Sequence, residues 1–166
     1  MYLNDMKEIK FIADVMLGKL AKWLRIVGID VLYDNKITDE ELIYISNQEK
    51  RILLTRDKKL SFDKRLKEVI FIENELIDKQ IKEFFEKTKI RPDNLFSRCI
   101  ICNEELMKVV DKKEIKSKVP VYTYLTHNDF SICKRCGKLY WKGTHRDNMK
   151  RKIDKLIFQS AYQGKK

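Results

Sequence analysis

Short apolar runs alternate with amphipathic stretches through the first half of the chain. The runs cover residues 10–13, 29–33, 51–55 and 69–72 and are rich in Ile, Val, Leu and Phe. Runs this short and this apolar are typical of strands buried on both faces of a parallel sheet. Their alternation with helical stretches is typical of successive β-α units, so the pattern predicts a three-layer α/β domain.

Three helices are predicted between these strands. The first has apolar residues at helical spacing, followed by Gly28 where a left-handed C-terminal cap belongs; these residues are Leu17, Leu20, Ala21, Leu24 and Val27. The second is predicted over residues 39–47. The third carries four apolar residues on one face: Ile77, Ile81, Phe84 and Phe85.

A second module is predicted after a linker at residues 88–94, which contains Pro92 and few apolar residues. The domain boundaries we expect are therefore 1–93 and 94–166. Strands are predicted at residues 105–110 and 119–125, on either side of a charged turn. A basic helix is predicted at the end of the chain, and five of its residues fall on one face: Met149, Ile153, Leu156, Ile157 and Ser160.

All four cysteines belong to this second module. Cys99 and Cys102 form one Cys-x-x-Cys pair, and Cys133 and Cys136 form another, with 30 residues between the pairs. Two such pairs are typical of a structural zinc site, in which four thiolates surround one ion. Two disulfides, or buried cysteines acting as small apolar residues, are the alternatives. The interval is longer than the usual ~15 to 20 residues, so we expect an insertion between the two knuckles.

The positive charge is concentrated in the same module. The chain has a net charge of +11; residues 1–93 carry +1 of it and residues 94–166 carry +10. A surplus of this sign attracts polyanions, of which RNA and DNA are the commonest in the cytosol. A generally Lys-rich and Glu-rich composition would explain the total, but not its uneven placement.

Three acidic residues are placed at the expected carboxyl edge of the sheet. Asp14 follows the first run, Asp57 follows the third, and Asp39 begins the second predicted helix. Carboxylates that converge there need a cation between them, and an all-oxygen set favours Mg²⁺ or Mn²⁺. Such an ion can activate water for attack on a phosphodiester. Helix capping or turn formation is the alternative role for each acid.

Basic residues near these acids are candidates for phosphate binding. Lys19, Lys22 and Arg25 form a stripe on the first predicted helix, although a solvated helix face is the more usual explanation of a stripe of three. Arg56 and Lys58 flank Asp57. The remaining candidate for nucleic-acid contact is His145, which lies too far beyond the last cysteine to act as a standard zinc ligand.

Several classes of protein are disfavoured by what the sequence lacks. It contains no Ser-His-Asp set, P-loop or Gly-x-Gly-x-x-Gly motif, which argues against enzymes that use nucleotide cofactors. The first apolar stretch is interrupted by charges and does not resemble a signal peptide, and no run is long enough to span a membrane. We therefore expect a cytoplasmic protein that is not inserted in a membrane.

Four segments together resemble the Mut-seven C-terminal RNase family, a PIN-like group. They are residues 11–25 with the following Gly28, residues 51–57, residues 97–103 around the first cysteine pair, and residues 133–145 around the second. The resemblance covers nearly the whole chain in order. It implies a PIN-like fold with a C-terminal zinc ribbon, and a metal-dependent ribonuclease activity.

The resemblance also implies a role for the three acids, because Asp14, Asp39 and Asp57 match the acidic positions of PIN nucleases. The sequence departs from that pattern at Lys59, where such nucleases often have a fourth acid. Asp34 and Asp63 are possible substitutes.

Two main hypotheses about function follow. The first is a ribonuclease in which Asp14, Asp39 and Asp57 hold Mg²⁺ or Mn²⁺, while the zinc ribbon binds the RNA. The second is an RNA-binding adaptor without catalysis, which the missing fourth acid favours. A toxin-like nuclease awaiting an antitoxin partner fits the α/β fold, but not the appended ribbon.

Overall fold

The computed structural model describes residues 9–158, which fall into two compact units. The division lies between Phe96 and Ser97. The first unit has a parallel sheet and the second a smaller antiparallel one, and each is described here by itself.

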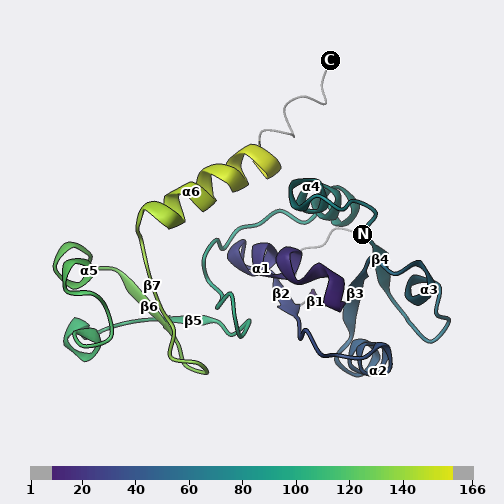
Figure 1. The fold of residues 1–166 in the computed structure, drawn as a ribbon, viewed down its shortest axis with the longest axis horizontal. Helices are drawn as coiled ribbons and strands as arrows, with labels where there is room; N and C mark the ends of the chain where they lie inside the picture. Colours follow the sequence, from purple (N-terminus) through teal and green to yellow (C-terminus); the bar gives the residue numbers. More distant parts are fainter. Residues whose placement is uncertain (1–8, 159–166) are drawn as a thin grey trace, which may run out of the picture. The chain divides into compact units, whose positions relative to one another are not determined.

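The first unit is built on a four-stranded parallel sheet (Figure 1). Its strands are β1 (Lys10–Ala13), β2 (Asp30–Leu32), β3 (Arg51–Thr55) and β4 (Val69–Phe71). The spatial order is β2-β1-β3-β4, so β1 and β3 are central. Their short apolar runs form buried parallel strands, and the predicted α/β fold is confirmed.

Helices cover both faces of this sheet. They are a 3₁₀ turn, η1 (Val15–Leu17), and four α-helices: α1 (Gly18–Ile26), α2 (Asp39–Glu49), α3 (Lys58–Ser61) and α4 (Ile77–Thr88). Phe11 of β1 packs edge-on against Phe84 of α4, with 5.1 Å between ring centroids. The next residue, Ile12, points to the opposite face and clusters with Leu42 and Leu60 of α2 and α3. This alternation along one strand gives the three layers.

Local sequence signals set the ends of the helices. Gly28 follows α1 with φ of 91°, the left-handed conformation that glycine adopts without steric cost. Helix α2 starts with a capping box, in which Thr38 accepts from the N–H of Glu41 and the Glu41 carboxylate accepts from the N–H of Thr38. Both features are readable from the sequence.

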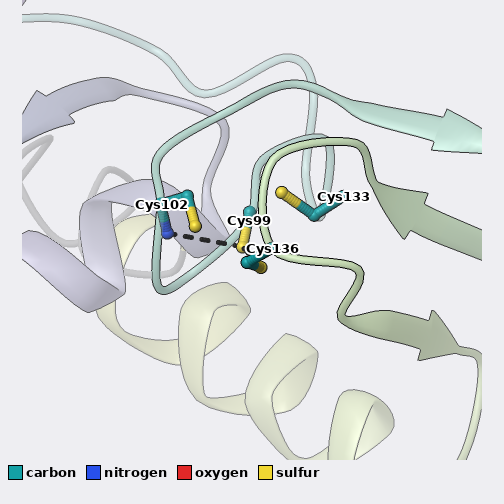
Figure 2. Close-up of side chains that lie close together, drawn as sticks. All are labelled: Cys99, Cys102, Cys133 and Cys136. Carbon is teal, nitrogen blue, oxygen red and sulfur yellow. Dashed lines mark hydrogen bonds between the residues drawn. The ribbon is translucent and has the colours of Figure 1, made fainter.

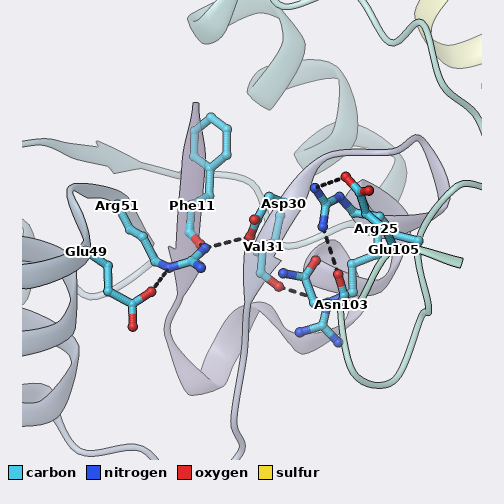
Figure 3. Close-up of polar contacts among 9 residues, drawn as sticks. Phe11, Arg25, Asp30, Val31, Glu49, Arg51, Asn103 and Glu105 are labelled. Atoms are coloured by element: carbon cyan, nitrogen blue, oxygen red, sulfur yellow. Dashed lines mark hydrogen bonds and ion pairs between the residues drawn. The ribbon is translucent and has the colours of Figure 1, made fainter. Parts of the chain in front are cut away.

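Arg51 ties three strands together at the amino edge of the sheet (Figure 3). Its Nη1 donates to Asp30 Oδ1 at 2.6 Å and to the carbonyl of Phe11 at 3.1 Å, and its Nε donates to Glu49 at 2.6 Å. One guanidinium therefore joins the starts of β2, β1 and β3. The opposite, carboxyl edge holds the acids predicted from the sequence.

The second unit is built on a three-stranded antiparallel sheet. Its strands are β5 (Leu106–Lys108), β6 (Phe130–Cys133) and β7 (Leu139–Trp141), in the order β5-β6-β7. Its helical segments are η2 (Lys112–Ile115), α5 (Val121–Thr126), α6 (Thr144–Ile153) and a π-helical turn, η3 (Asp154–Phe158). The long segment between the two cysteine pairs contributes a small core of Ile115, Val119 and Phe130, and Trp141 of β7 packs against this core.

One predicted strand is wrong. The strand predicted at residues 119–125 is instead helix α5, which begins after Pro120 with the N–H of Tyr124 donating to the carbonyl of Pro120. Pro120 supplies a fixed φ suited to a helix start, which outweighed the β-branched and aromatic residues that follow it. Strand β5 pairs instead with β6, which pairs in turn with β7, and the periodicity revealed neither of these strands. The predicted basic C-terminal helix is present as α6, while Ser160 lies outside the described residues.

Candidate functional site

The topology of the parallel sheet marks one crevice. The chain passes from β1 to β2 on one side, then returns past β1 to β3 on the other, so the strand order reverses between β1 and β3. Ligands of open α/β sheets bind outside the carboxyl ends of the strands at such a switch point. Asp14 directly follows β1, and Thr55 is the last residue of β3.

Asp14 is a buried carboxylate at that switch point, with only 3% of its surface exposed. Its Oδ1 accepts from the N–H of Met16 at 2.7 Å, which caps η1. Its Oδ2 accepts from the N–H of Arg56 at 2.9 Å and from the hydroxyl of Thr55. The carboxylate thus holds the segments after β1 and β3 together. Of its roughly four lone-pair positions, three are occupied.

Asp57 is connected to Asp14 through Thr55. The Thr55 hydroxyl donates to Asp14 and accepts from the N–H of Asp57 at 2.9 Å. The side chain of Asp57 is exposed and caps α3, where its Oδ1 accepts from the N–H of Leu60 at 3.1 Å. Asp39 is exposed in the first turn of α2, one residue after the capping Thr38. All three acids follow strands of the sheet and so belong to its carboxyl edge.

The three acids do not form a preassembled metal site. Within residues 9–158, only the four cysteines form a group of three or more His, Cys, Asp or Glu side chains close enough to share a metal ion. The three acids do not form such a group. The possible substitutes have other partners: Asp34 accepts from the N–H of Lys36, and Asp63 pairs with Arg65. Hydrogen bonds from Arg65 lower the pKa of Asp63 to about 2. The catalytic role of Asp14, Asp39 and Asp57 stays a prediction.

The predicted basic residues have different environments. Lys19, Lys22 and Arg56 line one groove at the carboxyl edge, with a volume of about 600 Å³. Arg25, in contrast, is buried, and its Nε donates to the carbonyl of Val31 at 2.9 Å, so it does not share the solvent-facing stripe of Lys19 and Lys22. Lys58 and Lys59 are exposed in α3, and His145 is exposed in the first turn of α6.

The cysteines of the second unit lie in two knuckles of matching backbone geometry. In the first knuckle, the N–H of Asn103 donates to the carbonyl of Cys99 at 2.9 Å. In the second, the N–H of Gly137 donates to the carbonyl of Cys133 at 2.8 Å. Asn103 and Gly137 both have positive φ, of 66° and 72°. The chain therefore turns back in the same way after each first cysteine. The glycine directly after the second cysteine pair, Gly137, is a turn signal readable from the sequence. Asn103 was missed, although asparagine tolerates this conformation better than most residues.

The two knuckles bring all four sulfur atoms together (Figure 2). The Sγ atoms of Cys99, Cys102, Cys133 and Cys136 lie within 4.8 Å of one another, and none is in a disulfide. Four thiolates at such separations suit a tetrahedral ion with metal–sulfur bonds of about 2.3 Å, as zinc has. The donor set therefore fits zinc and leaves no open position for a substrate.

Tyr140 of β7 stabilises this cluster from outside the sulfur set. Its hydroxyl lies 3.1 Å from Cys99 Sγ and accepts from the N–H of Ile100 at 3.2 Å. Burial opposes ionisation of Cys99, but hydrogen bonds from Tyr140 and from backbone N–H groups outweigh it and lower the pKa of Cys99 to about 7. Burial and the neighbouring Cys136 raise the pKa of Cys102 to about 12. Without a cation, the close sulfur atoms do not all ionise.

The fold and the site geometry agree with comparisons against known proteins. A family model described as the Mut7-C RNAse domain matches residues 9–153. The chain belongs to this family. The match includes the parallel sheet, both cysteine knuckles and α6 in one continuous region, so the two units are parts of one family architecture.

One curated relative is a nuclease by name. The chain is 29% identical over 131 residues to the protein named Exonuclease mut-7 from Caenorhabditis elegans. The matched region is 71% of this chain but only 14% of that relative. No solved structure matches this Mut7-C chain. Family and relative together support a nuclease type of function.

The helices were also compared with the requirements of a membrane span. Among residues 9–158, no helix combines the length and the apolar character needed to cross a bilayer.

Proposed function

We propose that this Mut7-C chain is a ribonuclease that cleaves RNA phosphodiester bonds at the carboxyl edge of its parallel sheet. The observation that carries the proposal is the placement of Asp14. It is a buried acid at the switch point between β1 and β3, in a chain whose family is described as an RNase domain. Ligands of open α/β sheets bind at such switch points, and the Asp14 carboxylate, which accepts three hydrogen bonds, keeps about one lone-pair position for a ligand there.

Mg²⁺ or Mn²⁺ is the cofactor we propose for this reaction. Mg²⁺ is commonly bound by one or two carboxylates together with substrate phosphates, so a preassembled set of three acids is not required. Asp14 and Asp57, which are joined through Thr55, would hold the ion, and Asp39 at the same edge is the third candidate. When bound, the ion would activate water and stabilise charge on the phosphodiester.

The zinc-bearing unit is proposed to hold the RNA strand. Its support is electrostatic, because residues 94–166 carry +10 of the net charge of +11. Charge of that density attracts a phosphate backbone irrespective of sequence. In this proposal the zinc ion is structural, and His145 and the basic face of α6 contact the RNA.

The second candidate function is an RNA-binding adaptor without catalysis. Lys59 stands where PIN nucleases often carry a fourth acid, and the acids are not gathered in advance. Both observations favour binding without cleavage.

Cleavage assays with zinc-loaded protein separate the two functions. We expect an unstructured RNA to be cut when Mn²⁺ or Mg²⁺ is added and to stay intact in metal-free buffer that preserves the zinc. Asp57→Asn is expected to slow the cut, while the exposed Asp93→Asn serves as the matched control. Tight RNA binding with no cleavage at any Mn²⁺ concentration would instead establish the adaptor.

A further inference from the structure

The groove that contains Lys19 and Arg56 lies beside Asp14. Segments that follow all four strands line it: η1 and the start of α1, then Tyr33, then Arg56, then the loop and first turn of α4. Two of its lining residues, Met16 and Arg56, donate backbone N–H groups to the carboxylate of Asp14. A ligand in this groove is therefore positioned next to the proposed reaction centre.

One side of the groove is cationic. Lys19, Lys22 and Arg56 line it, and Glu75 is the acid among its lining residues. Arg56 carries a planar fork of donors that suits a phosphate group, and the two lysines add point charges beside it. The excess of positive charge selects an anion.

The hydrogen bonds of Arg56 are incomplete. Its Nη2 pairs with Glu75 at 3.1 Å, but the Glu75 side chain is 84% exposed. Its Nε is buried and has no hydrogen-bond partner within the described part of the chain. An ion pair with so exposed an acid contributes little to stability. A phosphate, with several acceptor oxygens, can replace Glu75 as the acceptor of Nη2, and the buried Nε can donate to it once the Arg56 side chain turns.

The other side of the groove is apolar and open to solvent. Met16 is 55% exposed and Leu76 is 64% exposed, and Tyr33 lies among the same lining residues. Exposed apolar side chains gathered beside cations suit a nucleic-acid base, whose flat face stacks on such groups next to its phosphate.

Tyr33 is held in this groove by a close approach to α1. Its hydroxyl donates to the carbonyl of Val15 at 3.3 Å and lies over Gly18. A Cβ added at Gly18 would lie 2.5 Å from the Tyr33 hydroxyl oxygen. Gly18 has ordinary helical angles, with φ of −58° and ψ of −35°, so the absence of a side chain there makes room for Tyr33.

We propose that this groove binds one nucleotide of single-stranded RNA, with its phosphate on Arg56 and the two lysines and its base on the apolar side. The inference deepens the proposed ribonuclease function and rests on it, because it assigns the substrate subsite beside Asp14. It commits to a phosphodiester ligand on charge complementarity, and a protein segment is the competing occupant.

The first test maps where RNA touches the chain. A single-stranded oligoribonucleotide containing 4-thiouridine is cross-linked to the zinc-loaded full chain without Mg²⁺ or Mn²⁺, and the linked peptides are identified by mass spectrometry. We expect cross-links in the peptides containing Met16 or Tyr33. Cross-links confined to residues beyond Ser97 would overturn the proposal.

The second test measures affinity by fluorescence anisotropy at several salt concentrations. Removing two phosphate contacts by Lys19→Ala with Lys22→Ala should reduce the slope of log affinity against log salt by roughly 1.4. The matched control changes Lys79 and Lys82, exposed lysines of α4, and should leave the slope within error of the original chain. An equal reduction in both double variants would overturn the proposal, because it would indicate general attraction only.

A third variant tests the apolar side without changing charge. Gly18→Ala fits the helix and should displace Tyr33, weakening oligonucleotide binding about tenfold with unchanged circular dichroism. Unchanged affinity would count against stacking on Tyr33.

These results are separable from the ribonuclease proposal. Loss of binding in the groove variants, with no cleavage by the original chain, supports the groove and refutes the ribonuclease. Cleavage that the groove variants perform with unchanged affinity refutes the groove alone.

Discussion

Glu83 of α4 holds the loop that forms one wall of the groove proposed to bind RNA. Its Oε1 accepts from the N–H of Glu73 at 2.9 Å and from Lys87 Nζ at 2.7 Å. Its Oε2 accepts from the N–H of Asn74 at 3.1 Å and from the side-chain amide of Asn74 at 2.7 Å. The substitution Glu83→Gln keeps the shape but removes the charge that these four donors face.

The pKa of Glu83 sets the size of the effect. Burial alone would raise the pKa of Glu83. Hydrogen bonds from the backbone N–H of Glu73, from the Lys87 side chain and from Asn74 outweigh burial and lower this pKa from 4.5 to about 2. Each pKa unit corresponds to 1.36 kcal/mol, so the ionised carboxylate stabilises the folded state by roughly 3 kcal/mol at pH 7. Because the folded pKa is depressed, this contribution is complete above the unfolded pKa and is lost as the pH falls toward 2. At pH 3 it should be about half as large.

Amide hydrogen exchange measured by mass spectrometry tests this contribution of Glu83 to stability, because peptides from residues 9–96 report on the first unit alone. Glu83→Gln should lower the opening free energy of β4 and α4 at pH 7 by roughly 3 kcal/mol, and by clearly less at pH 3. The control is Glu86→Gln on the same helix, where the side chain is exposed. A loss no larger than that of the control, or a loss equal at both pH values, would refute the reasoning.

Three further predictions concern the core and the four-cysteine cluster. Phe84→Ala should cost about 4 kcal/mol in urea denaturation, because Phe84 is fully buried against Phe11; a loss under about 1 kcal/mol would contradict the described packing. Gly137→Ala should cost about 1 kcal/mol through its positive φ alone, since an added Cβ meets nothing within 4 Å, whereas Gly137→Asn should cost less; equal costs would point to another cause. Removing zinc with a chelator should unfold residues 97–146 and spare 9–96, because structural zinc contributes roughly 10 to 16 kcal/mol to such modules; hydrogen exchange that stays unchanged in the knuckles would contradict this.

The first unit was largely predictable from sequence because local and tertiary preferences agree there. Strands β1 and β3 have the predicted ends. Strand β2 is one residue shorter than predicted at each end, and β4 ends one residue earlier than predicted. The capping box of α2 and the glycine after α1 were also readable. Where turn and capping residues favour the same structure as burial does, a short apolar run is sufficient to predict the position of a strand.

The second unit was predictable in its chemistry but not in its strands. The cysteine spacing indicated the four-sulfur cluster, because ligand spacing reflects local knuckle geometry. The strand order was not readable, since β6 and β7 are short and their apolar residues are mixed with ligands and charges. Tyr140 and Asn103 were missed for a related reason: their roles depend on neighbours brought close by the fold, Cys99 Sγ for the first and the carbonyl of Cys99 for the second.

In the candidate site too, local features were predictable from the sequence and contacts between distant residues were not. Sequence position placed Asp14, Asp39 and Asp57 after strands, but could not show that Thr55 connects two of them or that Arg25 is buried. Both depend on side-chain directions across neighbouring elements, which the apolar pattern does not encode.

The measurement that tests the central claim most directly is single-turnover cleavage of an unstructured RNA by zinc-loaded protein in Mn²⁺. With Asp14→Asn the account predicts a rate lowered about 100-fold or more, with RNA affinity retained, while Asp93→Asn cleaves at the original rate. Equal cleavage by the original chain and Asp14→Asn would contradict the assignment of the reaction to the carboxyl edge of the sheet.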